Sequence, residues 1–600
     1  MRKGALAAAA ILLAVTGCAD SDDLPIPRPY GMTVSGYHGG PDRLGWNDQE
    51  PTLTPARVPS LAPSWSSPPF DAAIVDGVAY APHLYATPLY VETLRISRGP
   101  FAGFTTSVVI AATSNGDVHA INAATGTSVP AGTVLWSARL GRPAMTTTKS
   151  DGVPVGILGT PVLDLSAFPP RVYVGCADAV TGWQAHALDL GSGAEISGWP
   201  VTIDPASVEP VNVNRSSAGV AHFADFRLLA QRSALALSPD GGALYVPFGA
   251  YYDQTMGWIV AIDTAQPRVV SSFSGGPVDG GGAGMWAAGG PAVTADGRVF
   301  VTTGNSAPTS GNTPGVWGNS LVQFDRWLHV QRSYSPFNYC LLDHADTDLG
   351  ACSPMTFDLD PAVSGTTHLA AFGGKQGSVY LVDRDALPGG TVRRPDCDVA
   401  NPPSPDSDLS LLAPTVQSAY SPPSRGPLHV FGPYSDGDDD NQLDNAKMRS
   451  TPAFYRDASG ATFLYVAGNS RDPADISTIV PPSLVRLRVV TAPGSAPYLA
   501  VDGKATDVAF KNPGSPIVTS SHGTNAVVWV VDENQKRTQP LEPTAMFTPA
   551  GPVLWAFDAK SMAPLWTAAL GAPGGKYSHP IVVRGTVIAG TDRLRAFSLP

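Results

Sequence analysis

The chain has 600 residues and the composition of a globular protein that is rich in turns. Glycine (62 residues) and proline (58 residues) make up a fifth of it, too many turn formers for a helical bundle. Charged residues are only 15% of the chain, which argues against a coiled coil or a disordered acidic tail. The formal net charge of −12 disfavours nucleic acid and anionic membrane surfaces as partners of the folded body. The composition indicates an all-β chain with many short strands.

The N-terminus has the features of a bacterial export signal. Basic residues precede the apolar run 5–15, which is too short to span a bilayer as a helix. The run ends in Leu-Ala-Val-Thr-Gly-Cys18, which resembles the lipobox of bacterial lipoproteins, where the cysteine is acylated and becomes the new N-terminus. We therefore expect a lipoprotein signal peptide over residues 1–17 and lipid attachment at Cys18. The alternative is an ordinary signal peptide with a chance cysteine.

The segment after the lipobox predicts a linker. Residues 18–45 are rich in Asp, Pro and Gly and show no periodicity, so we expect a flexible tether between the lipid and a folded body over residues 46–600. The protein is then exported and anchored to the bacterial cell envelope, on its periplasmic or cell-surface face. Contact with the membrane is expected through the lipid anchor only.

One sequence unit recurs along the folded body. An apolar β-branched run, a turn and a second apolar run ending in Asp or Asn are followed by Thr-Gly and Trp, most clearly over residues 108–136. Each unit predicts a small antiparallel sheet that cannot bury both faces alone, so the units must stack around a closed ring. A β-sandwich is the alternative. The anchors of eight units fall at positions 122, 189, 263, 325, 383, about 487, 558 and 598.

These units resemble the tryptophan-docking repeats of pyrroloquinoline-quinone (PQQ) type eight-bladed β-propellers, the fold of quinoprotein alcohol dehydrogenases. Further matching motifs lie at 85–91, 159–162, 284–293 and 301–305. The resemblance implies an all-β propeller of eight four-stranded blades, with seven blades as the alternative. The last strand, 587–597, is expected to pair with an N-terminal segment between Asp71 and Val91, because closure removes exposed sheet edges.

The resemblance also implies what a catalytic centre would need: PQQ, a Ca²⁺ ion that polarises it, an aspartate base and often a vicinal disulfide. Asn305 matches the position of an asparagine calcium ligand. Gly318 stands where the base is expected, and Val180 stands where a glutamate calcium ligand is expected, although Asp178 is two residues away. No two cysteines are adjacent in the sequence. We therefore expect neither PQQ nor catalysis.

Export to an oxidising compartment permits disulfides. Cys340 and Cys352 flank one short loop, so they are expected to form a bridge, whereas the sequence does not pair Cys176 or Cys397. The loop between the first two carries a dense polar run, 343–348, which we expect to be a solvated loop between blades. A metal or substrate contact is the alternative.

A second acidic run predicts a metal site. It follows a Pro-rich insertion, expected between two blades at about 384–430. Oxygen ligands at positions 1, 3, 5, 7 and 9 of a tight loop are typical of calcium sites. Here they would be Asp436, Asp438, Asp440, the carbonyl of Gln442, and Asp444. The spacing favours a structural calcium ion, and the alternative is a disordered acidic loop.

The function that follows is that of an envelope-tethered lipoprotein whose non-catalytic propeller is a binding or assembly scaffold. Its partner would be an envelope protein or a glycan, which the sequence does not define further. The first alternative is a PQQ- and calcium-dependent alcohol or sugar dehydrogenase facing the periplasm. The second alternative is a polysaccharide-binding propeller.

Overall fold

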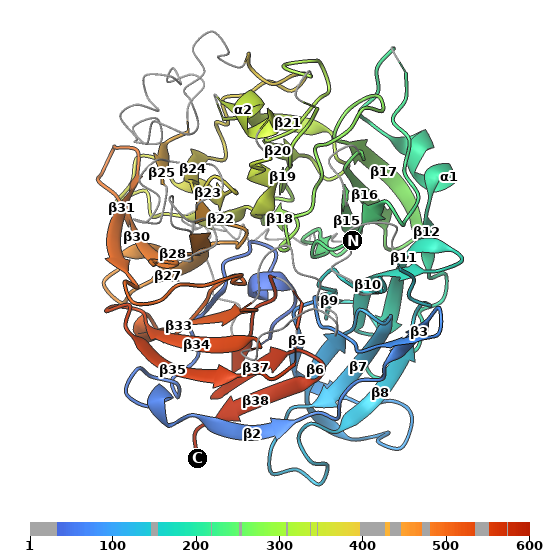
Figure 1. Ribbon diagram of the computed structural model, residues 1–600, viewed down its shortest axis with the longest axis vertical. Helices are drawn as coiled ribbons and strands as arrows, with labels where there is room; N and C mark the ends of the chain where they lie inside the picture. The colour runs from blue at the N-terminus through green and yellow to red at the C-terminus, as the bar shows by residue number, and fades with distance from the viewer. Residues whose placement is uncertain are drawn as a thin grey trace, which may run out of the picture.

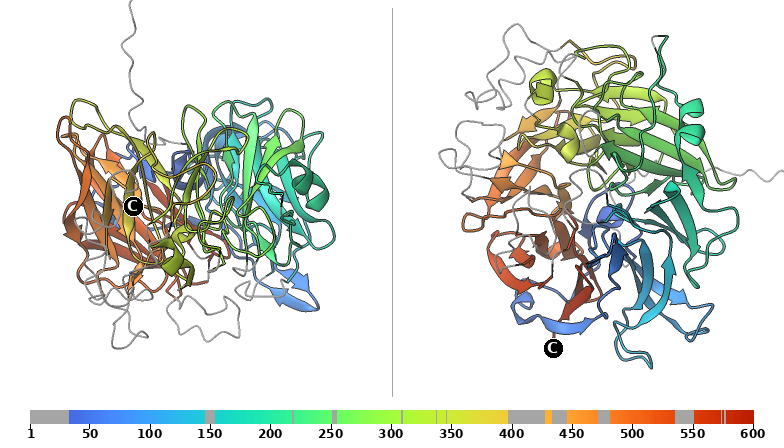
Figure 2. Two further views of the ribbon diagram at one scale, coloured as in Figure 1. Left: turned by 90° about the horizontal axis from the view of Figure 1, so that it is seen from above. Right: turned by 45° about the vertical axis from the view of Figure 1, so that its right-hand side comes forward.

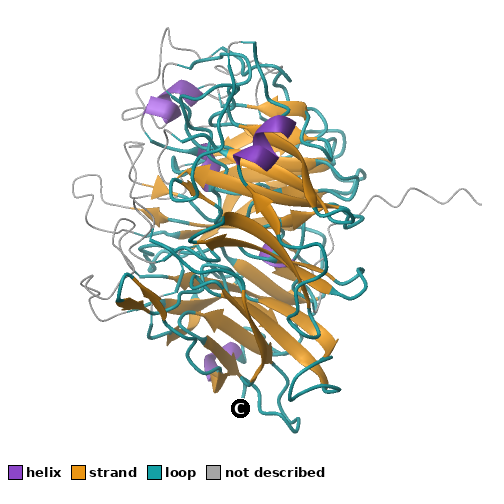
Figure 3. Ribbon diagram, turned by 90° about the vertical axis from the view of Figure 1, so that its right-hand side faces the viewer, coloured by secondary structure: helices purple, strands orange, loops and turns teal. Residues whose placement is uncertain are grey.

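The computed structural model is a closed ring of β-sheets (Figure 1). It describes residues 33–145, 154–217, 219–250, 255–307, 310–336, 338–344, 346–396, 427–432, 446–470, 481–534, 551–572, 574–575 and 577–600. Strands dominate these residues and helices are few and short (Figure 3). No helix in these ranges is long and apolar enough to cross a membrane.

The ring is an eight-bladed β-propeller, as the repeats predicted, and each blade is an antiparallel sheet whose first strand faces the ring axis. Blade 1 consists of β5 (Leu89–Arg95), β6 (Thr105–Ala112), β7 (Asp117–Asn122) and β8 (Val134–Arg139). Blade 2 consists of β9 (Val162–Asp164), β10 (Arg171–Asp178), β11 (Gly182–Asp189) and β12 (Val201–Ile203). Blade 3 consists of β13 (Leu229–Ala230) and β14 (Ala236–Leu237), which both pair with β15 (Ala243–Ala250), then β16 (Trp258–Asp263) and β17 (Arg268–Ser274). Blade 4 consists of β18 (Ala292–Val293), β19 (Val299–Thr302), β20 (Leu321–Phe324) and β21 (Val330–Tyr334).

The second half of the ring repeats this order. Blade 5 consists of β22 (Met355–Asp358), β23 (His368–Gly373), β24 (Val379–Asp383) and β25 (His429–Phe431). Blade 6 consists of β27 (Ala453–Arg456), β28 (Thr462–Ala467), β30 (Leu484–Val490) and β31 (Tyr498–Lys504). Blade 7 consists of β32 (Ile517–Ser521), β33 (Thr524–Asp532), β34 (Val553–Asp558) and β35 (Pro564–Ala569). Blade 8 consists of β36 (Ile581–Val583), β37 (Thr586–Gly590), β38 (Leu594–Ser598) and, from the N-terminal part of the chain, β2 (Ala62–Ser66).

The remaining elements are small. β1 (Trp46–Asn47) pairs in parallel with β32, and two hairpin-like pairs lie outside the blades, β3 (Ala73–Val75) with β4 (Val78–Tyr80) and β26 (Ala446–Lys447) with β29 (Asn469–Ser470). The helices are α1 (Pro205–Val208), α2 (Tyr339–His344), and the 3₁₀ turns η1 (Tyr37–Gly39), η2 (Val58–Ser60), η3 (Glu209–Val211) and η4 (Leu349–Ala351). The eight predicted anchor positions all lie in the third strand of a blade or directly after it.

Neighbouring blades bury their faces against one another, and this explains why many strands read as continuous apolar runs. All six residues of β7 are buried, and Val108 of blade 1 packs in the same apolar cluster as Val174 of blade 2. Tryptophans dock between blades as the repeat predicted. Trp136 Nε1 donates to the carbonyl of Leu190 in blade 2 (2.9 Å), and the indole lies against Gly193, where a Cβ atom would approach Trp136 Cε3 to 2.5 Å.

The N-terminal segment 34–47 fills the middle of the ring (Figures 1 and 2, blue). Backbone bonds join Val34 to Tyr90 in blade 1, and carbonyls of the segment then accept from Leu163, Val293, Thr356, Phe454 and Val518 of blades 2, 4, 5, 6 and 7. Arg43 bonds the Leu235 carbonyl at the start of β14 in blade 3, and Asn47 bonds the Val582 carbonyl in blade 8. The segment therefore satisfies inner-edge polar groups of all eight blades.

This finding corrects the predicted tether. Residues 34–45 belong to the folded body, and Val34, Tyr37, His38, Arg43 and Leu44 are almost completely buried. Their glycine-rich composition belongs to a buried segment that runs through the middle of the ring, and not to a solvated linker. The tether can extend only to about residue 33, where the described chain begins.

Two further predictions are corrected. The last strand, β38, pairs with β2, where Ala62 lies opposite Ser598, and not with a strand within 71–91. That region contains the separate hairpin β3–β4 and the start of β5 of blade 1. The Pro-rich insertion lies between β24 and β25, which are the third and fourth strands of blade 5. It is thus an insertion within a blade, and its first part bonds to the outer strand of blade 4 through Ser333 and Gly389.

Candidate functional site

The antiparallel order of each blade gives the ring two different faces. Turns that join second to third strands, and segments that join one blade to the next, lie on one face, which we call the polar-cluster face after Asn305 and Lys375. Turns that join first to second and third to fourth strands lie on the opposite face, which we call the cavity face after Asp164 and Asp296. Each face carries one candidate site.

The polar-cluster face holds a buried network around Asn305, directly after β19. The Asn305 backbone N–H donates to Asp348 Oδ1 (2.7 Å), and its side-chain amide lies 3.0 Å from that of Asn319. Asn319 donates to Asp343 Oδ1 (2.8 Å) and accepts from the Leu349 N–H (2.8 Å). Blade 4 thus supplies two amides, and the segment leading into blade 5 supplies the carboxylates.

Two cations form ion pairs with these carboxylates. Lys375, in the turn between β23 and β24, donates to Asp346 Oδ1 (2.7 Å) and is paired with Asp348. Arg394, which is completely buried, pairs with Asp343 at 3.3 Å and lies over the ring of Tyr339. Burial alone would raise the pKa of Asp348, but the Lys375 ammonium overcomes that effect and lowers it. Burial raises the pKa of Asp343 despite Arg394.

Aromatic side chains extend the site toward the axis. Trp286 precedes β18, and the guanidinium of Arg232 lies 4.7 Å from the centre of its indole ring. The same guanidinium lies 5.4 Å from the ring of Tyr577, which precedes blade 8. Lys375 Nζ lies 5.4 Å from the Trp286 ring. Cationic side chains therefore cover the aromatic surface on which a flat ligand would stack.

The cavity face holds the second candidate site, an axial cavity of about 1020 Å³. Its floor is formed by Gly36, Gly40 and Asp42 of the N-terminal segment. Its walls come from the first strands of blades 2 to 5 and the turns that follow them, and are mainly apolar. They include Val162, Leu163, Leu237, Val293 and Phe357.

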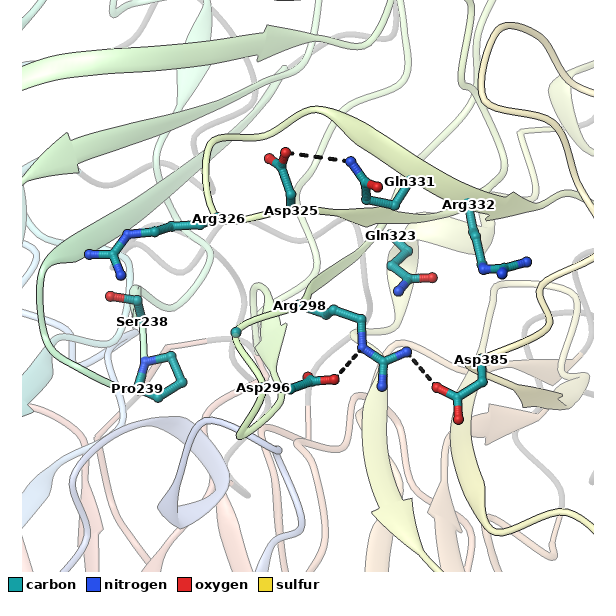
Figure 4. A pocket seen from close by; sticks show the side chains of 11 residues that line it. Ser238, Pro239, Asp296, Arg298, Gln323, Asp325, Arg326, Gln331, Arg332 and Asp385 are labelled. Atoms are coloured by element: carbon teal, nitrogen blue, oxygen red, sulfur yellow. Dashed lines mark hydrogen bonds and ion pairs between the residues drawn. The ribbon is translucent and has the colours of Figure 1, made fainter.

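A polar shelf continues from this cavity across blade 4 (Figure 4). Its volume is about 540 Å³, and Ser238, Asp296 and Arg298 line both spaces. Arg298 lies between Asp296 (2.7 Å) and Asp385 (2.5 Å), as Figure 4 shows. The shelf therefore presents charges that are largely paired with each other.

No protein-family model matches the chain. No curated protein matches it in sequence. Solved structures do match. The quinohemoprotein alcohol dehydrogenase ADHIIG of Pseudomonas putida HK5 superposes with a TM-score of 0.57 at 12% identity, over 94% of this chain and 80% of that one. The quinohemoprotein alcohol dehydrogenase of Comamonas testosteroni gives 0.55 at 14% identity over 94% and 80%. A europium-containing methanol dehydrogenase gives 0.54 at 13% identity over 95% and 98%.

The chain has the quinoprotein alcohol dehydrogenase fold. At these identities the likeness concerns the fold alone. Whether this quinoprotein-fold chain has the residues of the PQQ–calcium centre that the sequence resemblance implied depends on each position separately. Asn305 is present and buried, at the start of the polar network. Gly318 packs so tightly that a Cβ atom would collide with Ser306, so no carboxylate base can stand there. Val180 is 72% exposed, and Asp178 accepts bonds from the N–H groups of its own turn.

The donor set does not fit calcium. Three carboxylates, Asp343, Asp346 and Asp348, face the charges of Lys375, Arg394 and Lys447, so the cluster is already neutral. A calcium ion would add two uncompensated positive charges next to the Lys375 ammonium. Within the described ranges, no group of three or more His, Cys, Asp or Glu side chains is arranged to hold a metal ion.

The carboxylates of this network are the residues that sequence reasoning placed wrongly. The run 343–348 was expected to be a solvated loop, but Asp343 and Asp348 are buried and bond to residues of blade 4. The signal that pointed to them was the density of acidic residues in the run. No motif in the sequence indicates that Lys375 and Arg394 supply their counter-charges.

The predicted Cys340–Cys352 bridge is wrong. Cys352 is a free, fully buried thiol whose Sγ donates to the Ser450 carbonyl (2.8 Å), whereas Cys340 is disulfide-bonded and so has another partner. Cys352 follows η4 and points into the apolar cluster shared by blades 5 and 6, away from the loop that was expected to close on it. Burial raises its pKa to about 12. Cys176 is also free and buried.

Three other predicted features lie outside the described residues. They are the predicted lipid attachment residue Cys18, the residue Cys397 for which the sequence indicates no partner, and the predicted calcium loop of Asp436, Asp438, Asp440, Gln442 and Asp444.

Proposed function

We propose that this protein is a non-catalytic member of the quinoprotein-fold propellers that works as a binding scaffold in the bacterial cell envelope. The observation that carries the proposal is the position of Lys375. Its ammonium lies between Asp346 and Asp348 beside Asn305, where a metal ion would need the same oxygen ligands. The protein thus uses an internal cation to hold this network together.

The aromatic surface of the site supports the same conclusion. A planar quinone would need the open face of Trp286, but the guanidinium of Arg232 lies over that face and also over Tyr577. A bound quinone would displace the Arg232 guanidinium from these rings. The negative charges of the quinone would attract this cation, but its displacement would remove a contact between blades 3, 4 and 8. The network therefore works as an interblade brace, and the binding surface is expected elsewhere on the ring.

The location of the protein rests on its sequence. The lipobox supports export and lipid attachment at Cys18, on the periplasmic or cell-surface side of the envelope. The loop 436–444 is proposed to hold a structural calcium ion, because its acidic spacing is typical of such sites.

Reconstitution tests the absence of catalysis. The mature chain is incubated with PQQ and Ca²⁺, and dye reduction is followed over a panel of alcohols and aldoses. A quinoprotein alcohol dehydrogenase stripped of its cofactor and treated in the same way is the positive control. We expect no PQQ-dependent turnover from this chain. Turnover with any substrate would overturn the proposal in favour of a PQQ- and calcium-dependent dehydrogenase.

A further inference from the structure

We propose that the axial cavity on the cavity face binds a molecule with an apolar body and a cationic group, held by the carboxylate of Asp42. The inference deepens the proposed binding function and rests on it, because it names a site and a ligand chemistry for the scaffold. The cavity lies on the opposite face from the Asn305 network, so it is separate from the place where the fold would hold a quinone.

The size and walls of the cavity suit a small molecule. Its volume of about 1020 Å³ is at the upper end of the range for sites that enclose drug-sized ligands. Val162, Leu237, Val293 and Phe357 provide an apolar lining, and Leu165 stands at the rim with 43% of its surface exposed. An apolar ligand would therefore be largely removed from water.

The charges in the cavity decide which polar group the ligand carries. Arg384 pairs with Asp358 at 2.6 Å, and Arg298 pairs with Asp296 at 2.7 Å, so these four side chains neutralise each other. The guanidinium of Arg43 donates to backbone carbonyls, including those of Pro291 and Leu235, and its charge also acts on the neighbouring Asp42. The cavity thus offers no uncommitted cation to an anionic ligand.

Asp42 is different from the paired carboxylates. It lies on the cavity floor, partly exposed, and none of the ion pairs in the described part of the chain includes it. Its carboxylate accepts from the backbone N–H groups of Asp42 itself and of Leu44, and the positive charge of Arg43 acts on it more strongly than the negative charge of Asp358. A carboxylate at the bottom of an apolar cavity gains most from a ligand cation, because a charge-assisted bond is strong where water is excluded.

The same geometry makes binding dependent on pH. Burial raises the pKa of Asp42 to about 7, and so the carboxylate becomes protonated as the pH falls through neutrality. The charged and titratable groups that line the cavity with it are Arg43 from its own segment, Asp164 from blade 2, Asp296 and Arg298 from blade 4, and Asp358, His368 and Arg384 from blade 5. A cation should therefore bind more tightly at pH 8 than at pH 6.

A charge series of probes tests the proposal by titration calorimetry on the mature full-length protein. The probes are 4-phenylbutylamine, 4-phenylbutan-1-ol and 4-phenylbutanoate, which share one apolar body and carry a cation, no charge and an anion. We expect the amine to bind at pH 8, the alcohol to bind at least tenfold more weakly, and the acid weakest of all, as a charge-assisted bond implies. Failure of the amine to bind, or equal binding of amine and alcohol, would overturn the proposal.

Two isosteric variants locate the contact. Asp42→Asn should weaken amine binding about tenfold and remove its pH dependence, without changing the affinity for the alcohol. Asp164→Asn is the matched control, because that carboxylate lies on the wall and is held by Ser166 and the Ala167 N–H. If both variants lose affinity equally, Asp42 is not the anchor and the proposal fails. Dehydrogenase activity with PQQ would overturn the proposed function but leave these results unchanged, so the two failures are distinguishable.

Discussion

Arg43 Nη2 donates a 2.9 Å hydrogen bond to the Leu235 carbonyl, joining the N-terminal segment to blade 3 at the middle of the ring. The same guanidinium also donates to the carbonyls of Pro291, Tyr37 and Gly40. One buried side chain therefore donates hydrogen bonds to carbonyls of two blades and of the segment itself. The stability of the ring depends on this segment because it satisfies polar groups that would otherwise face an empty channel.

Replacing this arginine tests how much the segment contributes. Arg43→Met keeps the approximate length of the side chain but leaves buried carbonyls without donors, which should lower the free energy of unfolding by about 3 kcal/mol or more. Denaturant titration followed by tryptophan fluorescence measures the change. Arg227→Met is the control, because Arg227 is an exposed residue that pairs with Asp225 at 3.8 Å and should contribute little. Equal midpoints for the two variants would contradict a structural role of the segment.

Acidification should weaken the same region. Burial lowers the pKa of His579 to about 4, and burial together with His579 lowers that of His38 well below its usual value. Both rings are neutral in the folded protein, and the backbone N–H of His38 donates to His579 Nε2 (3.1 Å). The unfolded chain binds more protons below about pH 6.5, so stability falls as the pH drops from about 6.5 toward 4, by about 3 kcal/mol for His579.

Melting curves measured across this pH range check the sign. His579→Gln should flatten the pH dependence of the melting temperature, because the variant cannot take up that proton. His522→Gln is the control, since the side chain of His522 is 86% exposed. A wild-type melting temperature that does not fall below pH 6, or a slope unchanged in His579→Gln, would show that these histidines do not control acid stability.

Tryptophan docking can be tested with two glycines of similar backbone conformation. Gly193 (φ 69°) lies against Trp136, whereas Gly126 (φ 74°) has open space around its Cα. Gly126→Ala should lower the free energy of unfolding only by the strain of a positive φ, about 1 kcal/mol. Gly193→Ala should lower it by a further 1–3 kcal/mol, roughly, because the added methyl group displaces the indole of Trp136. Unfolding free energies of both variants give the difference. Equal losses would mean that the Trp136 contact does not contribute.

The state of the cysteines gives a chemical test. Cys176 and Cys352 are free and buried, so an alkylating reagent should leave both unmodified in the native protein and label both after denaturation without reductant. Cys340 should be labelled only after reduction, because it is disulfide-bonded. Peptide mass spectrometry reads all three sites. Labelling of Cys340 but not Cys352 in the unreduced, denatured chain would contradict the structure.

The sequence predicts the blades well because each one is a local pattern. The strand–turn–strand periodicity around Asn122, Asp189 or Asp558 depends on neighbours within some 30 residues, so the third strand of every blade could be located. The residues of segment 34–47 carry no such signal. Their burial comes from bonds to strands hundreds of residues away, such as that of Asn47 to Val582, and composition alone makes them look like a linker.

In the candidate sites, too, the residues of local motifs could be predicted from the sequence, whereas contacts between distant segments could not. Asn305 and Gly318 could be assigned from a local motif, and the structure adds that Gly318 packs so closely on Ser306 that a Cβ atom there would collide with it. The positions of Asp348 and Lys375 relative to Asn305 depend on how blades 4 and 5 meet. Asp42 belongs to the axial cavity only because the N-terminal segment lies across the ring, a placement that no sequence motif indicates.

Direct binding of PQQ is the measurement that tests the central claim, because binding needs no knowledge of a substrate. Titration calorimetry of the mature protein with PQQ, in the presence of Ca²⁺ or of a lanthanide ion, should give no heat beyond that of dilution. The variant Arg232→Ala should give no heat of binding either, because the Lys375 ammonium still lies within the network. Saturable binding of PQQ to the wild-type chain, lost on removal of the metal ion, would contradict the account and make this propeller a quinoprotein in chemistry as well as in fold.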